Sequence, residues 1–141
     1  MLNASTDWLD EKHCAVVFET LDRLESMLAQ ARYLVGNVMT EADVRLFTTI
    51  VRFGTHCRLI DQLINADPVY HGHFKCNVRT IEHGYPNILR WLRRVYQTHK
   101  VNGTVNMDHI KKLYYTSQIK INPTQIVPLN NGPDLNIPID Q

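Results

Sequence analysis

The chain has 141 residues, of which 44% are hydrophobic and 21% are charged, a composition typical of one globular domain with its own core. A formal net charge of +1 favours neither nucleic acid nor an anionic membrane as a partner. No apolar run is long enough to span a bilayer, residues 1–10 lack the apolar stretch of a secretory signal, and three cysteines without a CxxC pair indicate free thiols. We therefore expect a cytoplasmic protein with no membrane and no nucleic-acid partner.

The first predicted helix runs from about Asp10 to Tyr33. Its apolar residues recur at steps of three and four, which is the period of a helix with one buried face. Gly36 and Asn37 follow it as a stop signal. The apolar stripe that we expect in the core consists of Val17, Leu21, Leu24, Leu28 and Ala31. The charged residues expected on the other faces are Glu19, Asp22, Arg23 and Glu25.

A second predicted helix begins at Thr40, where Thr40-Glu41-Ala42-Asp43 has the spacing of an N-capping box. In such a box the Thr40 hydroxyl accepts the N–H of Asp43, and the Asp43 carboxylate accepts the N–H of Thr40. We expect Thr40 and Asp43 to serve folding and not chemistry. The apolar face of this helix continues through Leu46, Phe47, Ile50 and Val51.

A third predicted helix opens at Pro86, since proline is favoured in a first helical turn. The residues expected to face inward are Ile88, Leu89, Leu92, Val95 and Tyr96. Arg90, Arg93 and Arg94 would lie outward, either as an anion-binding group or as a solvated face. We favour the solvated face, because charge runs on helices are commonly just exposed.

A fourth predicted helix runs from an Asn106 cap to about Ser117, with His109 placed for bonding in its first turn. Beyond Ile121, prolines rule out a long helix, so we expect an extended tail with a frayed end at Asn130–Gln141. No segment alternates as a strand does. The predicted fold class is all-α.

Two stretches are the most distinctive of the chain. Asp67–Asn77 combines a proline-led turn with Tyr70, two histidines, a lysine and a thiol, and Asp108–Tyr115 carries an Asp-His-Ile run that leads to Tyr114 and Tyr115. Together with Thr40–Asp43, they resemble the C-terminal helical domain of the glutathionyl-hydroquinone reductases, the xi class of glutathione transferases. The resemblance runs from about Phe18 to Pro128, and we divide the chain into a glutathione S-transferase C-terminal-like domain, 1–128, and a flexible tail, 129–141.

The resemblance implies a substrate site but no nucleophile in this chain. In that family a cysteine thiolate attacks the sulfur of a glutathionyl-hydroquinone, the hydroquinone leaves, and glutathione, as co-substrate, regenerates the thiol. Tyr114 matches the tyrosine that hydrogen-bonds the phenolic oxygen, and Tyr70 matches a second wall of the pocket. The family's nucleophile lies in a Cys-Pro motif of a thioredoxin-like domain, and no Cys-Pro occurs here. The resemblance also implies a homodimer, with no cofactor bound by this chain.

His71, His73 and Cys76 invite other interpretations. Nitrogen and sulfur ligands at short spacing are typical of zinc sites, but this spacing matches no standard zinc module, and a fourth ligand would have to come from elsewhere. A thiol beside Lys75 could also be activated as a nucleophile. We favour neither metal nor catalysis here, and instead expect His73 and Lys75 to hold the turn by hydrogen bonds.

Residues 54–66 interrupt the resemblance. In the family the helix ending in Arg52-Phe53 runs directly into Asp67-Pro68, so these residues are an insertion. Two origins stay open: an unspliced short intron, or a genuine loop, which proteins tolerate because closure entropy rises slowly with length. Leu59, Ile60, Leu63 and Ile64 have helical spacing, so an extra amphipathic turn is compatible with the second origin.

Three functions therefore compete. The chain is the electrophile-pocket part of a glutathionyl-hydroquinone reductase and inactive by itself, or a non-catalytic helical module for protein contacts, or a small-molecule binder that retains the aromatic pocket. The electrophile-pocket function is our preferred hypothesis. An upstream segment with a Cys-Pro motif after a strand would favour it.

Overall fold

The structure is a computed structural model that describes residues 4–62, 81–117, 119, 123–127 and 133–139, with the backbone alone for 4–14, 53–62 and 114. Its α-helices are α1 (Ala4–Gln30), α2 (Glu41–Gln62), α4 (Ile81–Gly84), α5 (Pro86–Gln97) and α6 (Met107–Ser117), with a 3-10 turn, η1, at Asn102–Thr104. The described ranges contain no strand, only an isolated bridge between Tyr33 and Gly36. The predicted all-α class is confirmed. None of these helices combines the length and the hydropathy needed to cross a membrane.

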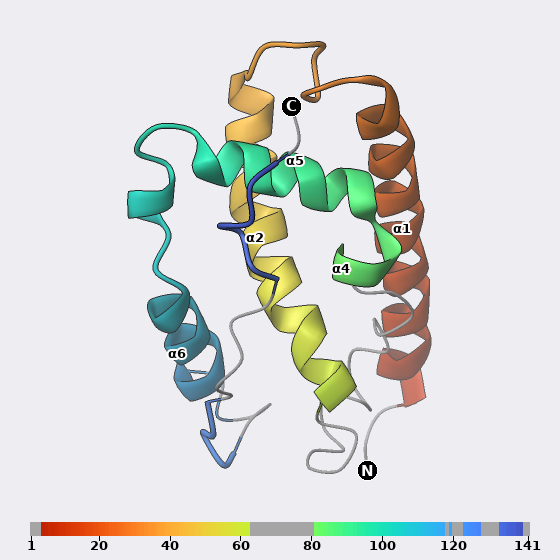
Figure 1. The fold of residues 1–141 in the computed structure, drawn as a ribbon. Helices are drawn as coiled ribbons and strands as arrows, with labels where there is room; N and C mark the ends of the chain where they lie inside the picture. Colours follow the sequence, from red (N-terminus) through yellow and green to blue (C-terminus); the bar gives the residue numbers. More distant parts are fainter. Residues whose placement is uncertain (1–3, 63–80, 118, 120–122, 128–132, 140–141) are drawn as a thin grey trace.

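The helices form a bundle in which α5 crosses α1 and α2 (Figure 1). α1 and α2 run in opposite directions, α5 lies across both, and α6 lies beside the lower part of α2. The core fills the space between α1, α2 and α5; its largest fully buried hydrophobic side chains are Trp91, Tyr85, Ile81, Ile88, Leu92 and Val95. Helix α5 is therefore the element that the bundle packs around.

Helix α1 differs from its prediction at both ends and in one core position. It begins at Ala4 and ends at Gln30, because the next residues turn back on themselves: the Tyr33 N–H donates to the Gly36 carbonyl at 2.9 Å, and Gly36 has a φ of 78°, which suits glycine. Leu21 and Leu28 are buried as predicted, whereas Val17 is exposed and Phe18 is buried in its place. At this end of α1 the buried position is therefore one residue later than the periodicity predicts.

Helices α2 and α5 bury the residues that their periodicity indicates. Phe47, Ile50 and Val51 of α2 are in the core. Helix α5 starts at Pro86 as predicted, and of its predicted inward residues only Tyr96 is half-exposed. Trp91 was missed, although it is 1% exposed.

The N-terminus of α5 is capped from another helix. Its N-cap residue, Tyr85, makes no capping bond with its side chain. Instead the Glu25 carboxylate of α1 accepts the backbone N–H groups of Asn87 at 2.8 Å and Ile88 at 2.9 Å, and the Asn87 amide at 2.7 Å. A negative group at this point also complements the positive end of the helix dipole. Glu25 was expected on an outward face, so this contact corrects that expectation.

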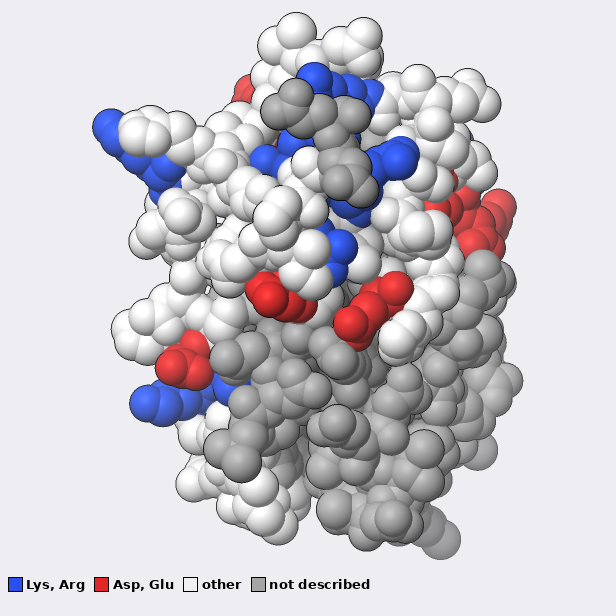
Figure 2. Space-filling model, in the orientation of Figure 1, with Lys and Arg blue, Asp and Glu red and all other residues white. Residues whose placement is uncertain are grey.

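The arginines of α5 connect it to its neighbours in the fold. Arg94 donates to the Arg32 carbonyl at 2.8 Å and lies 5.9 Å from the centroid of the Tyr33 ring, while Arg93 donates to the Asp134 carbonyl at 2.9 Å. Figure 2 shows Lys and Arg gathered over the part of this face where α5 crosses. The predicted solvated face is confirmed for Arg90 and wrong for Arg93 and Arg94, which are half-buried.

The described end of the tail lies on α5. Leu135 is buried in the core, and the Gln97 amide donates to the Leu135 carbonyl at 2.8 Å and to the Ile137 carbonyl at 2.7 Å. Residues 133–139 therefore differ from the frayed end that we expected, because α5 offers both an apolar site and donors for their carbonyls. The division of the chain at residue 128 stays a prediction.

We predict that Glu25→Ala lowers the free energy of unfolding by about 1–2 kcal/mol, because it leaves the first N–H groups of α5 without an acceptor. Urea unfolding followed by circular dichroism measures the change. Glu19→Ala is the matched control, since Glu19 is an exposed glutamate of the same helix. Equal effects of the two substitutions would contradict the capping role.

Candidate functional site

The Asp43 carboxylate is the best-defined polar centre of the described residues. Asp43 is 0% exposed. One carboxylate oxygen accepts the Leu34 N–H and the Trp91 indole N–H, both at 2.9 Å. The other accepts the Thr40 N–H at 2.9 Å and the Thr40 hydroxyl at 3.0 Å. Four donors from three segments thus surround one buried carboxylate.

This geometry corrects half of the predicted capping box. The Asp43 carboxylate accepts the Thr40 N–H, as the spacing predicts. The Thr40 hydroxyl, however, donates to that carboxylate, while the Asp43 N–H donates to the Thr40 backbone carbonyl at 3.1 Å. The hydroxyl turns toward the carboxylate because a buried negative charge needs every donor within reach.

The electrostatics of Asp43 follow from these contacts. Burial raises the pKa of the Asp43 carboxyl, but the hydrogen bonds from Leu34, Thr40 and Trp91 outweigh it and hold that pKa below its ordinary value. The folded protein therefore keeps Asp43 ionised. A carboxylate whose lone pairs are all engaged has no free position for a substrate, so its role is structural.

The predicted substrate residues are only partly within the described structure. Tyr114 lies in α6, of which Tyr114 itself is described by its backbone alone, and Tyr70 lies outside the described residues with the rest of Asp67–Asn77. Their roles stay predictions. Helix α6 itself begins as expected, since the Asn106 side chain accepts the His109 N–H at 3.0 Å, and Tyr115 is buried, in agreement with a packing role.

The zinc interpretation and the insertion also stay untested. His71, His73 and Cys76 lie outside the described residues; within them, no group of three or more His, Cys, Asp or Glu could hold a metal ion. The backbone of residues 54–62 continues α2 without interruption, while 63–66 are not described. A helical backbone does not distinguish an intron from an insertion, because any translated segment folds by the same rules.

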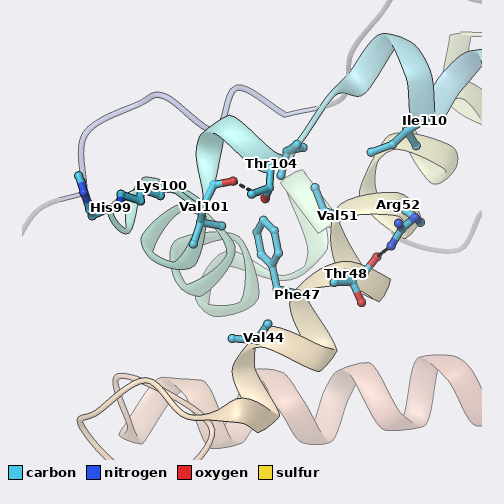
Figure 3. Close-up of a pocket in the computed structure, with 11 residues that line it drawn as sticks. Val44, Phe47, Thr48, Val51, Arg52, His99, Lys100, Val101, Thr104 and Ile110 are labelled. Atoms are coloured by element: carbon cyan, nitrogen blue, oxygen red, sulfur yellow. Dashed lines mark hydrogen bonds between the residues drawn. The ribbon is translucent and has the colours of Figure 1, made fainter.

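A groove of about 360 Å³ lies between α2, the turn that follows α5, and the start of α6. Figure 3 shows Phe47 projecting from α2 toward Val101 and Thr104 of that turn. Apolar side chains form most of its lining: Val44, Phe47, Val51, Val101, Val105 and Ile110. Its remaining lining residues are Thr48, Arg52, His99, Lys100 and Thr104. Sequence periodicity missed the groove, because half of it comes from a turn without a period.

Comparisons with known proteins place this geometry in a family. Residues 6–94 match the model described as "Glutathione S-transferase, C-terminal domain". The chain belongs to this family. The predicted resemblance is confirmed, because the relatives of this chain include glutathionyl-hydroquinone reductases and a xi-class glutathione transferase.

The relatives cover nearly all of this chain, while the chain covers a smaller part of each relative. It is 45% identical to glutathione S-transferase omega-like 2 of Schizosaccharomyces pombe, over 95% of this chain and 39% of that protein. It is 46% identical to the glutathionyl-hydroquinone reductase YqjG of Escherichia coli, over 88% of this chain and 34% of that protein. The chain thus spans less than two-fifths of the length of these curated relatives.

Solved structures of relatives share this arrangement of helices. The glutathione-bound structure of YqjG, a glutathione transferase homolog from E. coli, matches with a TM-score of 0.72 and 45% identity, over 91% of this chain and 37% of that one. The glutathione S-transferase Xi of Phanerochaete chrysosporium matches with a TM-score of 0.70 and 47% identity, over 92% and 37%. The helical arrangement around α5 is therefore that of the xi-class C-terminal domain.

We predict that Asp43→Asn costs about 3 kcal/mol of the free energy of unfolding. An asparagine amide must place its NH₂ group against either the Leu34 and Trp91 donors or the Thr40 N–H, so at least one donor loses its acceptor. Urea unfolding measures the loss. Glu41→Gln is the control: its carboxylate is exposed and pairs with Arg45 on the surface, so it changes stability by less than about 0.5 kcal/mol.

A second prediction concerns pH. Because the pKa of Asp43 is lowered in the folded state, its contribution to stability is complete above the pKa of an unfolded aspartate, about 3.9, and is lost as pH falls through the lower folded value. The difference in unfolding free energy between the wild type and Asp43→Asn is then constant from about pH 7 to about pH 5 and shrinks below about pH 4. Urea unfolding at a series of pH values tests this, and a difference that grows on acidification would show that the sign is wrong.

Proposed function

We propose that this chain is the electrophile-binding helical domain of a glutathionyl-hydroquinone reductase. The observation that carries the proposal is the 46% identity to a glutathionyl-hydroquinone reductase over 88% of the chain. The agreement of the backbone with the glutathione-bound relative supports it, with a TM-score of 0.72.

The reaction assigned to the complete protein is a reduction by two thiols. A cysteine thiolate attacks the sulfur of the glutathionyl-hydroquinone, an S–S bond forms, and the C–S bond breaks. The electron pair of the C–S bond stays with the ring carbon, which takes a proton, and the hydroquinone leaves. A glutathione thiolate then attacks the mixed disulfide, which releases glutathione disulfide and the cysteine thiolate. Glutathione is thus the co-substrate, and no other cofactor is needed.

The role of this domain is to hold the ring and stabilise the charge that it receives. Phenol hydroxyls at Tyr114 and Tyr70 are neutral donors near pH 7, since an ordinary tyrosine has a pKa near 10. A hydrogen bond to the phenolic oxygen of the substrate stabilises the electron density that enters the ring when the C–S bond breaks. The Asn106 cap and the buried Tyr115 fix the helix that carries Tyr114.

The nucleophile and the glutathione site belong to a thioredoxin-like part outside these 141 residues. None of Cys14, Cys57 and Cys76 is followed by proline, and about three-fifths of the length of the relatives lies beyond the matched region. We therefore assign the 141-residue chain no activity by itself. The complete protein is assigned to the cytoplasm as a homodimer.

The decisive test is a chimera in which this chain replaces the matched region of the E. coli relative. We predict that the chimera reduces glutathionyl-menadione, and that Tyr114→Phe in the chimera lowers kcat/KM by about tenfold or more, since one transition-state donor is lost. Tyr33→Phe is the matched control, because it removes a tyrosine hydroxyl at the α1–α2 connection. The 141-residue chain alone, assayed beside it, gives no turnover.

The outcomes separate the competing functions. A folded chimera that binds glutathione but has no activity would contradict the proposed domain role and favour the non-catalytic interaction module. Equal losses for Tyr114→Phe and Tyr33→Phe would remove Tyr114 from the pocket while leaving the domain role intact. Activity of the isolated chain would place the nucleophile within these 141 residues.

A further inference from the structure

The connection from α5 to α6 contains the dipeptide Asn102-Gly103, at the start of η1 (Figure 1). Asparagine is a chemically labile residue, and it is most labile before glycine, because glycine has no Cβ to hinder attack by its own backbone nitrogen. Both residues are exposed, so water and base reach them. Of the asparagines in the described ranges, only Asn102 precedes a glycine.

The Gly103 N–H is directed at the asparagine side chain. It donates to Oδ1 of Asn102 at 2.8 Å. Since a carbonyl bond is about 1.2 Å long, the Cγ carbon of Asn102 lies within about 4 Å of the Gly103 nitrogen. When this N–H loses its proton, the lone pair that remains points along the former N–H bond, toward the same carbonyl group. The folded turn therefore holds nucleophile and electrophile close to the separation from which reacting atoms attack.

Neither space nor backbone conformation requires the glycine at this position. A Cβ at Gly103 would meet no atom within 4 Å. Asn-Gly is common in turns because both residues tolerate a positive φ, but among the described glycines only Gly36 has one. An alanine would therefore fit at position 103, and what distinguishes the glycine is its unhindered nitrogen.

We propose that Asn102 is a site of spontaneous modification, at which asparagine is converted to aspartate and isoaspartate. The Gly103 nitrogen attacks Cγ of Asn102 and gives its proton to solvent, the side-chain nitrogen takes up a proton and leaves as ammonia, and a succinimide ring closes. Water then opens the ring. Attack at Cγ gives aspartate, and attack at the main-chain carbonyl carbon gives isoaspartate. One water is consumed and one ammonia is released, so the reaction does not depend on the proposed reductase function.

The two products differ in their effect on η1. The Asn102 carbonyl accepts the Val105 N–H at 3.2 Å, where η1 ends. Aspartate keeps this carbonyl, and its carboxylate accepts the Gly103 N–H. In isoaspartate the same carbon has become a free carboxylate, and the main chain runs through Cγ and is longer by one methylene. Val101 and Val105 pack against the core on either side of η1, so isoaspartate alone weakens the connection between α5 and α6.

The test is incubation of the folded 141-residue chain in mildly alkaline buffer, followed by trypsin digestion and mass spectrometry. The tryptic peptide 101–111 contains Asn102 and also Asn106, which is the internal comparison because it caps α6 and precedes methionine. We expect the mass gain of an amide-to-carboxyl conversion at Asn102, faster as pH rises because the attacking nitrogen must lose its proton, and none at Asn106. Asn131 also precedes glycine; it lies outside the described residues and falls in a different peptide, 121–141.

Two variants separate the chemistry from its effect on the fold. Gly103→Ala has room for its methyl group, so it keeps the melting temperature and slows the reaction at Asn102 by about tenfold, because the Cβ hinders the attack. Asn102→Asp carries the new charge without the longer main chain, so it melts as the unmodified chain does. The fraction of aged chain that an isoaspartyl methyltransferase labels melts about 3 °C lower.

Four results would count against these inferences. Equal rates at Asn102 and Asn106 would show that the geometry of the turn has no influence. A rate at Asn102 that is well below the rate in the urea-unfolded chain would show that the fold protects this residue. An undiminished rate in Gly103→Ala would exclude the Gly103 nitrogen as the nucleophile. Each of these three overturns the proposed site, whereas an isoaspartate fraction that melts as Asn102→Asp does would overturn the effect on η1.

Discussion

The buried carboxylate of Asp43 constrains three segments at once. It accepts hydrogen bonds from Leu34 in the connection before α2, from Thr40 at the start of α2, and from Trp91 in the middle of α5. An ionised group in such a place costs several kcal/mol if its partners are lost. The connection, α2 and α5 must therefore keep the same relative positions whenever the protein is folded, and the crossing of α5 over α2 follows from that requirement.

Helix α5 connects the remaining elements to this centre, because it makes hydrogen bonds to α1 and to the tail. Glu25 of α1 accepts hydrogen bonds from its first N–H groups. Near its other end, Arg93 donates to the carbonyl of residue 134, and Gln97 donates to those of residues 135 and 137. The turn that closes the groove follows directly after it. The same helix thus fixes α1 at one end and both the tail and the groove at the other, which explains why its buried residues dominate the core.

Sequence patterns predicted the helix starts and caps that depend on contacts between residues close together in the chain. The bond from the Thr40 N–H to the Asp43 carboxylate, the start of α5 at Pro86 and the Asn106 cap depend on residues within three or four positions of one another, and each is found as predicted. The partners of Asp43 and Glu25 were not predictable, because Trp91 is 48 residues from Asp43, and Asn87 is 62 residues from Glu25. Neither separation leaves a periodic signal. Trp91 itself could have been found, since it lies three positions from Ile88 and four from Val95 on one helical face.

The continuation of α2 bears on whether residues 54–62 disturb the core. Helix α2 extends through Gln62, so residues 54–62 lengthen it by about 14 Å at 1.5 Å per residue. The residues by which α2 enters the core, Phe47, Ile50 and Val51, all precede this extension. The carboxylate of Asp43, which fixes the start of α2 against α5, lies earlier still. Because every one of these contacts comes before residue 54, the added turns of α2 leave the packing that positions α5 intact.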